Sequence, residues 1–110
     1  MKQYVIDELR RDDHQKLKDY LESRLHSSGM DGIYRIFLED EILNDIQKTH
    51  SECHPFYLAV ELTETAMHCE LLVRAKNRLR CDCITYADRR QREWVIGLVD
   101  TIVETLGIQA

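Results

Sequence analysis

The feature that most constrains the fold is a regular alternation of apolar and polar side chains between Phe56 and Ala87. It falls into three runs, 56–62, 66–75 and 79–86, with apolar residues at about every second position. A period of two is typical of strands that bury one face. Because short connections separate the runs, we predict a three-stranded antiparallel meander over 56–87.

The apolar faces of the runs also predict their register, because a slip of one residue would turn a whole apolar set toward solvent. The expected partners are Val60 with Cys69, Leu58 with Leu71, Val73 with Cys81, and Leu71 with Cys83. These pairings make 67–73 the central strand. They leave 76–78 as a three-residue loop and put a turn around 63–65.

Further elements are expected before the meander. Residues 3–9 fit either a short edge strand or a first helical turn. Apolar spacing predicts a helix over 13–26, with Asp12 as N-cap and Gly29 at its C-terminal end. Residues 33–38 favour a fourth strand, with one long helix over 31–49 as the alternative. The acidic residues at 39–41 favour the start of a short helix that ends near His50.

The C-terminal segment predicts a long amphipathic helix. Asp88 is a good N-cap, and Gln91 occupies the capping-box position three residues later. Gly107 suits the left-handed end of the helix, and Ile108 follows it as an apolar residue that can fold back. The apolar stripe consists of Trp94, Val95, Leu98, Val99, Ile102, Val103 and Leu106. We expect this helix to cover the Cys69 face of the sheet.

Together these elements predict an α+β fold: a mostly antiparallel sheet of three or four strands, with helices chiefly on one face. The 110 residues form one domain, 1–110, and 44% hydrophobic residues suffice for a core. No signal peptide or membrane-spanning run is recognisable. We therefore expect a soluble cytoplasmic protein whose cysteines are free thiols.

Thiols and imidazoles form the first candidate site. The side-chain types suit zinc or another soft metal, and the candidate ligands are Cys53, His54, Cys69, Cys81 and Cys83, with His50 in the same loop as Cys53. On a strand, however, Cys81 and Cys83 would lie ~6–7 Å apart, and no Cys-x-x-Cys pair occurs. Packing of these cysteines in the core is the alternative. No cofactor is predicted outright, and zinc is the possible one.

A basic window between 74 and 92 forms the second candidate site. It holds seven basic and two acidic residues, a net +5, whereas the rest of the chain carries −10. The basic side chains are Arg74, Lys76, Arg78, Arg80, Arg89, Arg90 and Arg92. Three of them fall at the N-terminal end of the last helix, which predicts either an anion site or a solvated surface. The net charge of −5 for the whole chain argues against nucleic acid as a partner.

Apolar residues on the polar side of the meander form the third candidate site. They are Leu72, Ile84 and Tyr86, with Tyr57 beside them. Such a patch predicts either a protein partner, most simply a second copy of the chain, or cover by a helix. The chain lacks a phosphate loop, a nucleophile elbow and a zinc-protease motif. The first expectation is therefore a non-enzymatic, homodimeric protein-interaction domain, with metal binding and anion or RNA binding as alternatives.

Parts of the sequence resemble a small family of uncharacterised bacterial cytosolic proteins. The similar residues are 69–74 (CELLVR), 79–87 (LRCDCITYA) and 30–33 (MDGI). The resemblance implies a bacterial, cytosolic origin. It implies no activity, and no functional residue is transferred from it.

Overall fold

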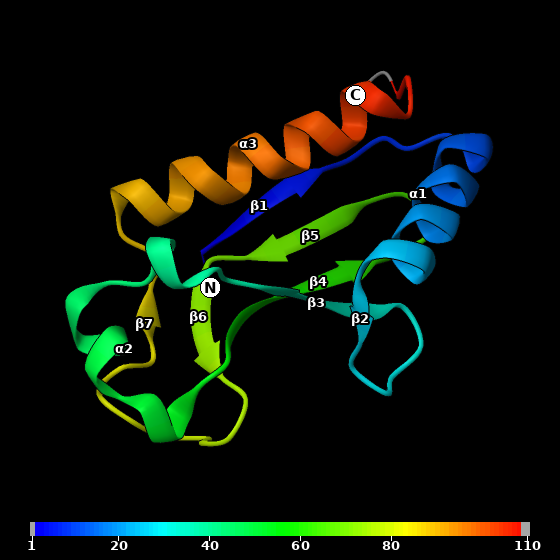
Figure 1. Ribbon diagram of the computed structural model, residues 1–110. Coiled ribbons are helices and arrows are strands. Elements are labelled where there is room, and N and C mark those ends of the chain that lie inside the picture. Colours follow the sequence, from blue (N-terminus) through cyan, green and yellow to red (C-terminus); the bar gives the residue numbers. More distant parts are fainter. Residues whose placement is uncertain (1, 109–110) are drawn as a thin grey trace.

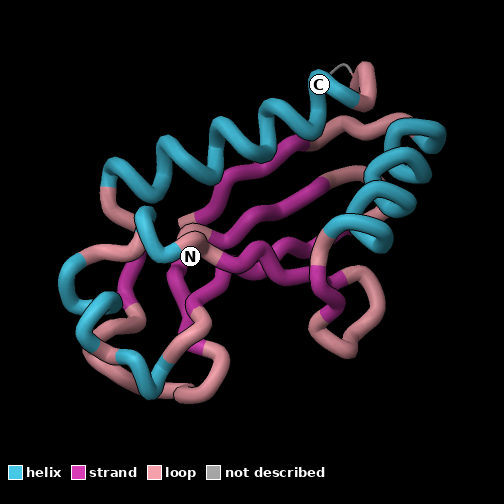
Figure 2. The backbone as a smooth tube through the Cα atoms, viewed as in Figure 1, coloured by secondary structure: helices cyan, strands magenta, loops and turns pink. Residues whose placement is uncertain are grey.

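The computed structural model describes residues 2–108, which form an α+β fold with a seven-stranded antiparallel sheet (Figures 1 and 2). The strands are β1 (Gln3–Ile6), β2 (His26–Ser27), β3 (Ile33–Phe37), β4 (Phe56–Leu62), β5 (Met67–Glu70), β6 (Leu72–Ala75) and β7 (Thr85–Tyr86). The helices are α1 (Arg11–Arg24), α2 (Asp45–Thr49) and α3 (Arg89–Thr105), with 3-10 turns η1 (Asp40–Ile42) and η2 (Ser51–Cys53).

The prediction of three or four strands is wrong, because short edge strands extend the sheet to seven. The main order is β1-β5-β4-β3-β2, and β6 pairs with β4 and β7. The ambiguous residues 3–9 supply β1, which pairs with β5. The predicted strand at 33–38 is confirmed as β3, so the long helix over 31–49 does not form. Two- to four-residue strands carry too little alternation to be recognised in a sequence.

The register is correct in one hairpin and wrong beyond Leu71. Val60 pairs with Cys69 as predicted, and the connection is a four-residue loop closed by a hydrogen bond from the Thr63 N–H to the Ala66 carbonyl. At Leu71 the ladder to β4 is interrupted, since its N–H donates to the Lys2 carbonyl and its own carbonyl accepts from Ala87. Pairing with β4 resumes in β6 with the register shifted by two residues, so Leu58 does not pair with Leu71.

The third run of the meander is mostly not a strand. Only Thr85 and Tyr86 form β7, where Tyr86 opposes Leu72 and Thr85 opposes Val73, so the predicted pairs with Cys81 and Cys83 are wrong. The expected three-residue loop is also shorter, because Ala75 bridges to Arg78 across residues 76 and 77. Leu79 is 99% exposed, which no core-facing strand residue would be. The alternation at 79–84 therefore comes from a loop whose cysteines turn inward.

The first two predicted helices form with shifted ends. The prediction for α1 was 13–26, but the helix begins at Arg11 after Arg10, so Asp12 lies in its first turn instead of capping it. It ends at Arg24, and Gly29 adopts its positive φ of 90° in the β2–β3 hairpin. The segment at 39–50 is divided into η1, which follows Glu39 without a side-chain cap, and α2, which is capped by the Asn44 side chain.

Helix α3 confirms the sequence prediction at both ends. The Asp88 side chain accepts from the Gln91 N–H, and the Gln91 side chain accepts from the Asp88 N–H, which makes a complete capping box. At the other end Gly107 has a φ of 69°, and the Ile108 N–H donates to the Val103 carbonyl. Ile108 is buried against the last turn, as this type of helix end requires.

One continuous core lies between the helices and one face of the sheet. Val60 and Cys69 on the sheet, Leu17 on α1 and Val95 on α3 belong to the same buried cluster. Figure 1 shows α3 running beside β1, and a hydrogen bond from the Tyr4 hydroxyl to Asp100 joins the two elements at 2.5 Å. Along β4 buried residues alternate with half-buried or exposed ones, so the opposite face of the strand stays accessible.

Candidate metal centre

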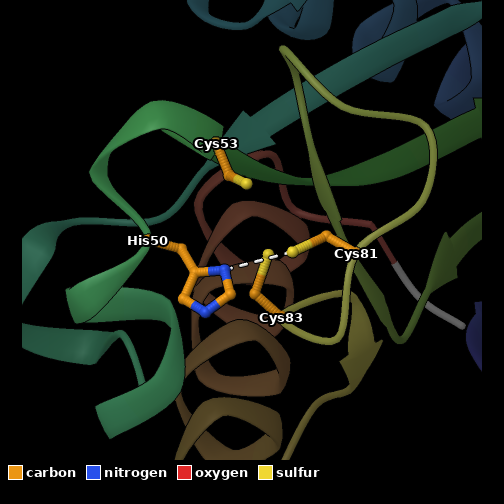
Figure 3. A group of neighbouring side chains, drawn as sticks. All are labelled: His50, Cys53, Cys81 and Cys83. Carbon is orange, nitrogen blue, oxygen red and sulfur yellow. Dashed lines mark hydrogen bonds between the residues drawn. The ribbon is translucent and has the colours of Figure 1, made fainter.

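Four side chains from two distant segments converge at one end of the molecule (Figure 3). His50, Cys53, Cys81 and Cys83 each offer one ligand atom, and these atoms all lie within 4.8 Å of one another. His50 Nδ1 lies 3.1 Å from Cys81 Sγ. Cys53 and Cys83 are buried, whereas His50 and Cys81 are half-buried, so the group is closed toward the core and borders the surface.

His50 and Cys53 are brought together by the 3-10 turn η2. His50 follows the last residue of α2, and the Cys53 N–H donates to the His50 carbonyl at 2.9 Å. In a 3-10 helix side chains three residues apart are eclipsed, so the imidazole and the thiol lie on the same side of the turn. A His-x-x-Cys pair in this conformation therefore presents two ligands to one point.

Cys81 and Cys83 are brought together by a second turn. The Ile84 N–H donates to the Cys81 carbonyl at 3.0 Å, which closes a four-residue turn over residues 81–84. Residues 81–84 thus form a turn and not an extended strand. The Cys81 and Cys83 sulfur atoms therefore lie within 4.8 Å of each other. Figure 3 shows both sulfur atoms directed at the space between His50 and Cys53.

A buried amide network fixes the two turns relative to each other. The Gln47 side chain is fully buried, and its Nε2 donates to the Cys83 carbonyl at 3.2 Å. Its Oε1 accepts from Gln91 Nε2 at 2.9 Å and from the Asn44 N–H at 3.1 Å. Since α2, α3 and the 81–84 turn all meet at Gln47, these protein contacts help to hold the backbone that carries Cys83.

The three thiols of the cluster differ in their readiness to lose a proton. A hydrogen bond from the Cys83 backbone N–H, and then one from its side chain, lower the pKa of Cys81 to about 7. Burial raises the pKa of Cys53, and burial followed by the neighbouring thiols raises the pKa of Cys83 to about 12. Three thiols crowded into one buried space cannot all ionise unless a cation compensates their charge. Cys81 is thus the thiol of the cluster that ionises most readily.

The donor set matches a structural zinc site. Three thiolates and one imidazole are a common zinc ligand set, and Zn–S bonds of ~2.3 Å give tetrahedral S···S edges of about 3.8 Å. The maximum separation of 4.8 Å between ligand atoms therefore closes on a tetrahedron with small side-chain adjustments. Because all four positions come from the protein, the arrangement suits a structural metal better than a catalytic one, which keeps an open position.

The structure gathers three of the five predicted ligands. Cys53, Cys81 and Cys83 belong to the cluster, whereas Cys69 lies on β5 with its side chain in the core, where burial and then Glu70 raise its pKa to about 12. His54 is also outside the cluster: its Nε2 contacts the Gln47 carbonyl at 2.8 Å, and its ring packs edge-on against Phe56. The fourth member is His50.

His50 was recognisable from its spacing. It precedes Cys53 by three residues, the same separation as in a Cys-x-x-Cys pair, whereas the adjacent His54 is one residue away. In the 3-10 turn this spacing aligns two side chains, and neighbouring residues point in different directions. The type of turn, however, is visible only in the structure.

The basic window is divided among several local interactions. Arg74 forms an ion pair with Glu70 at 3.1 Å, and Arg92 donates to the Ala87 carbonyl at 3.0 Å. Arg90 donates to the carbonyls of Glu41 and Leu43, at 2.8 and 3.0 Å. Lys76, Arg78, Arg80 and Arg89 are exposed. Near the start of α3, Arg90 thus holds the backbone of η1 and of Leu43 directly after it. Arg92 holds the backbone at Ala87, just before the N-cap of α3.

The four predicted interface residues occupy different surroundings. Leu72 and Tyr86 form a cross-strand pair, and the Lys2 amino group lies 5.3 Å from the centre of the Tyr86 ring. Ile84 packs against the core, and Tyr57 stacks beneath Arg35. Only Tyr86 among them is exposed, at 41%. The homodimer through this face therefore stays a prediction.

Comparison with known proteins gives no relative: no protein family, no curated protein and no solved structure matches the chain. Within residues 2–108, no helix is long and apolar enough to cross a lipid bilayer.

Proposed function

We propose that the protein is a zinc-binding protein whose single metal ion is held by His50, Cys53, Cys81 and Cys83. The observation that carries this proposal is the convergence of three thiols and one imidazole within 4.8 Å, from segments about thirty residues apart in the sequence. Core packing of cysteines explains buried thiols but not a histidine nitrogen placed 3.1 Å from one of them. The donor set excludes hard cations, which prefer oxygen ligands.

The metal would act as a structural cross-link. It would join the segment 40–55 to the segment 76–88, which together we call the metal lobe. Figure 2 shows that short helices and loops make up most of this lobe, whereas the longer strands lie outside it. Short elements bury little apolar surface, and a metal that binds only the folded arrangement stabilises it by its binding free energy. The metal would therefore serve to stabilise one end of the domain.

The experiment is metal analysis of untagged protein purified under reducing conditions, by native mass spectrometry and by competition with a zinc chelator. We expect one zinc ion per chain. Cys83→Ser and Cys81→Ser should each raise the zinc dissociation constant more than ~100-fold, because the loss of a ligand costs more than the loss of an outer-shell partner.

Two matched variants serve as controls. Cys69→Ser removes a buried thiol outside the cluster, and His54→Ala removes the histidine next to Cys53. Both should keep one zinc ion per chain, whereas His50→Ala should lose it. Wild-type protein that remains metal-free and folded with excess zinc would refute the proposal, as would equal zinc affinity in the Cys69 and Cys83 variants.

A further inference from the structure

The accessible face of the sheet carries a hollow of about 340 Å³ that shares no residue with the metal centre. Its volume lies at the lower end of the range for small-molecule sites, ~300–1,000 Å³. The hollow exists because Ala59, with the smallest side chain of the lining, lies in the middle of β4. Longer side chains from the neighbouring strands surround it.

The strand register places opposite charges on two sides of Ala59. Arg35 is its direct partner on β3, and Glu61 follows it by two residues on the same face of β4. The only ion pair among residues 2–108 is the one between Arg74 and Glu70, which forms another wall of the hollow. Arg35 and Glu61 thus border the same space with their charges uncompensated by a salt bridge.

Arg35 supplies a group that recognises carboxylates. Its guanidinium carbon lies over the Tyr57 ring, 4.9 Å from the ring centre, which is a cation–π contact. The N–H groups of a guanidinium match a carboxylate with two parallel hydrogen bonds. Glu61 offers the complementary acceptor for a protonated amine.

We propose that the hollow binds a small zwitterion that carries a carboxylate and a protonated amine, namely a free amino acid or the like. Its carboxylate would pair with Arg35 and its amine with Glu61, while its carbon skeleton lies over Ala59. Ile33 and Met30 add apolar lining, and Met30 is 64% exposed, so a side chain of the ligand can cover it. The proposal is independent of metal binding.

The test is a titration of ¹⁵N-labelled full-length protein with each of the twenty free amino acids up to 10 mM, followed by amide chemical shifts. We expect at least one to give saturable shifts confined to amides around Ala59 on β3, β4 and β5. The methyl ester of that amino acid, which lacks the carboxylate charge, and its N-acetyl form, which lacks the amine charge, should each bind at least ten times more weakly.

Three variants make the test specific. Ala59→Leu fills the hollow and should abolish the shifts, and Arg35→Gln should weaken binding at least tenfold. Arg24→Gln is the matched control, because Arg24 also stacks on a tyrosine, Tyr20, but lies on α1. It should bind like the wild type.

Absence of saturable shifts with all twenty amino acids would overturn the proposal. So would shifts that persist in Ala59→Leu, or equal binding of the N-acetyl form, which would reduce the site to a simple anion site.

Discussion

Cys81 and Cys69 show how strongly the surroundings change the pKa of two chemically identical side chains. Cys81 is half-buried and receives hydrogen bonds that stabilise its thiolate, whereas Cys69 is buried on β5 among apolar neighbours. The pKa is about 7 for the first and about 12 for the second. Since the thiolate is the reactive and metal-binding form, only Cys81 is ready to react at neutral pH.

Alkylation by iodoacetamide in metal-free protein tests this difference. The thiolate fraction rises as the pH rises through the pKa, so the modification rate of Cys81 should increase with a midpoint near pH 7. Cys69 should stay unmodified through pH 8 while the protein is folded. Peptide mass mapping over pH 5.5–9 measures both residues in one sample, and added zinc should protect Cys81. A midpoint near the ordinary thiol value of ~8.5, or equal rates at the two cysteines, would contradict the assignment.

Residue types in the sequence predicted a cluster of thiols and imidazole, but not which of these residues lie together. The sequence shows four cysteines and the histidines of the loop before β4, which indicates a soft metal. It does not show that residues 81–84 form a turn, because Cys81 and Cys83 fit the alternation of a strand equally well. If residues 81–84 formed a strand, Cys69 would lie on the same sheet face as Cys81 and Cys83. In the observed turn, Cys81 and Cys83 lie beside His50 instead.

At the scale of elements, the N-terminus of α3 gives a direct test of capping. Asp88→Ala removes the cap that accepts from the Gln91 N–H at 2.9 Å, and should lower the free energy of unfolding by about 1 kcal/mol. Asp12→Ala is the control, since Asp12 resembles a cap in the sequence but lies inside the first turn of α1. Its loss should cost less than ~0.5 kcal/mol. Urea unfolding of both variants measures the difference, and equal losses would contradict the capping role of Asp88.

The same two helix starts show which elements a sequence can specify. Helix α3 has a long apolar stripe and a cap that agree with each other, and the predicted capping box at Asp88 and the fold-back of Ile108 beyond the C-terminal end are both confirmed. For α1 the sequence motif indicates Asp12 as the N-cap, but the helix begins after Arg10. No local sequence feature distinguishes the two starts. The shift of register at Leu71 depends on hydrogen bonds to Lys2 and Ala87, which are distant in the sequence. Such contacts leave no local pattern.

At the scale of the whole molecule, the domain has two parts that we expect to differ in local stability. Strands β3 and β4 are joined by five consecutive residue pairs, and β4 continues to β5 with three more. In the metal lobe, α2 has five residues, the 3-10 turns have three each, and β7 has two. Elements this short are held mainly by tertiary contacts, so their local stability depends on what joins them.

Removal of the proposed zinc ion is therefore expected to loosen the metal lobe more than the rest of the sheet. When zinc is chelated, amides of the segments 40–55 and 76–88 should lose at least about tenfold in hydrogen-exchange protection. Amides of β3 and β4 should also lose protection but should keep more of it than the lobe, because in the chelated protein they still open only with global unfolding, whereas the lobe opens locally. Hydrogen–deuterium exchange of zinc-loaded and chelated wild type, with Cys69→Ser as a variant that keeps the site, measures both parts together. If chelation left β3 as weakly protected as the lobe, the metal would support the whole core, and unchanged protection in the lobe would mean that the buried contacts of Gln47 and Gln91 suffice to hold it.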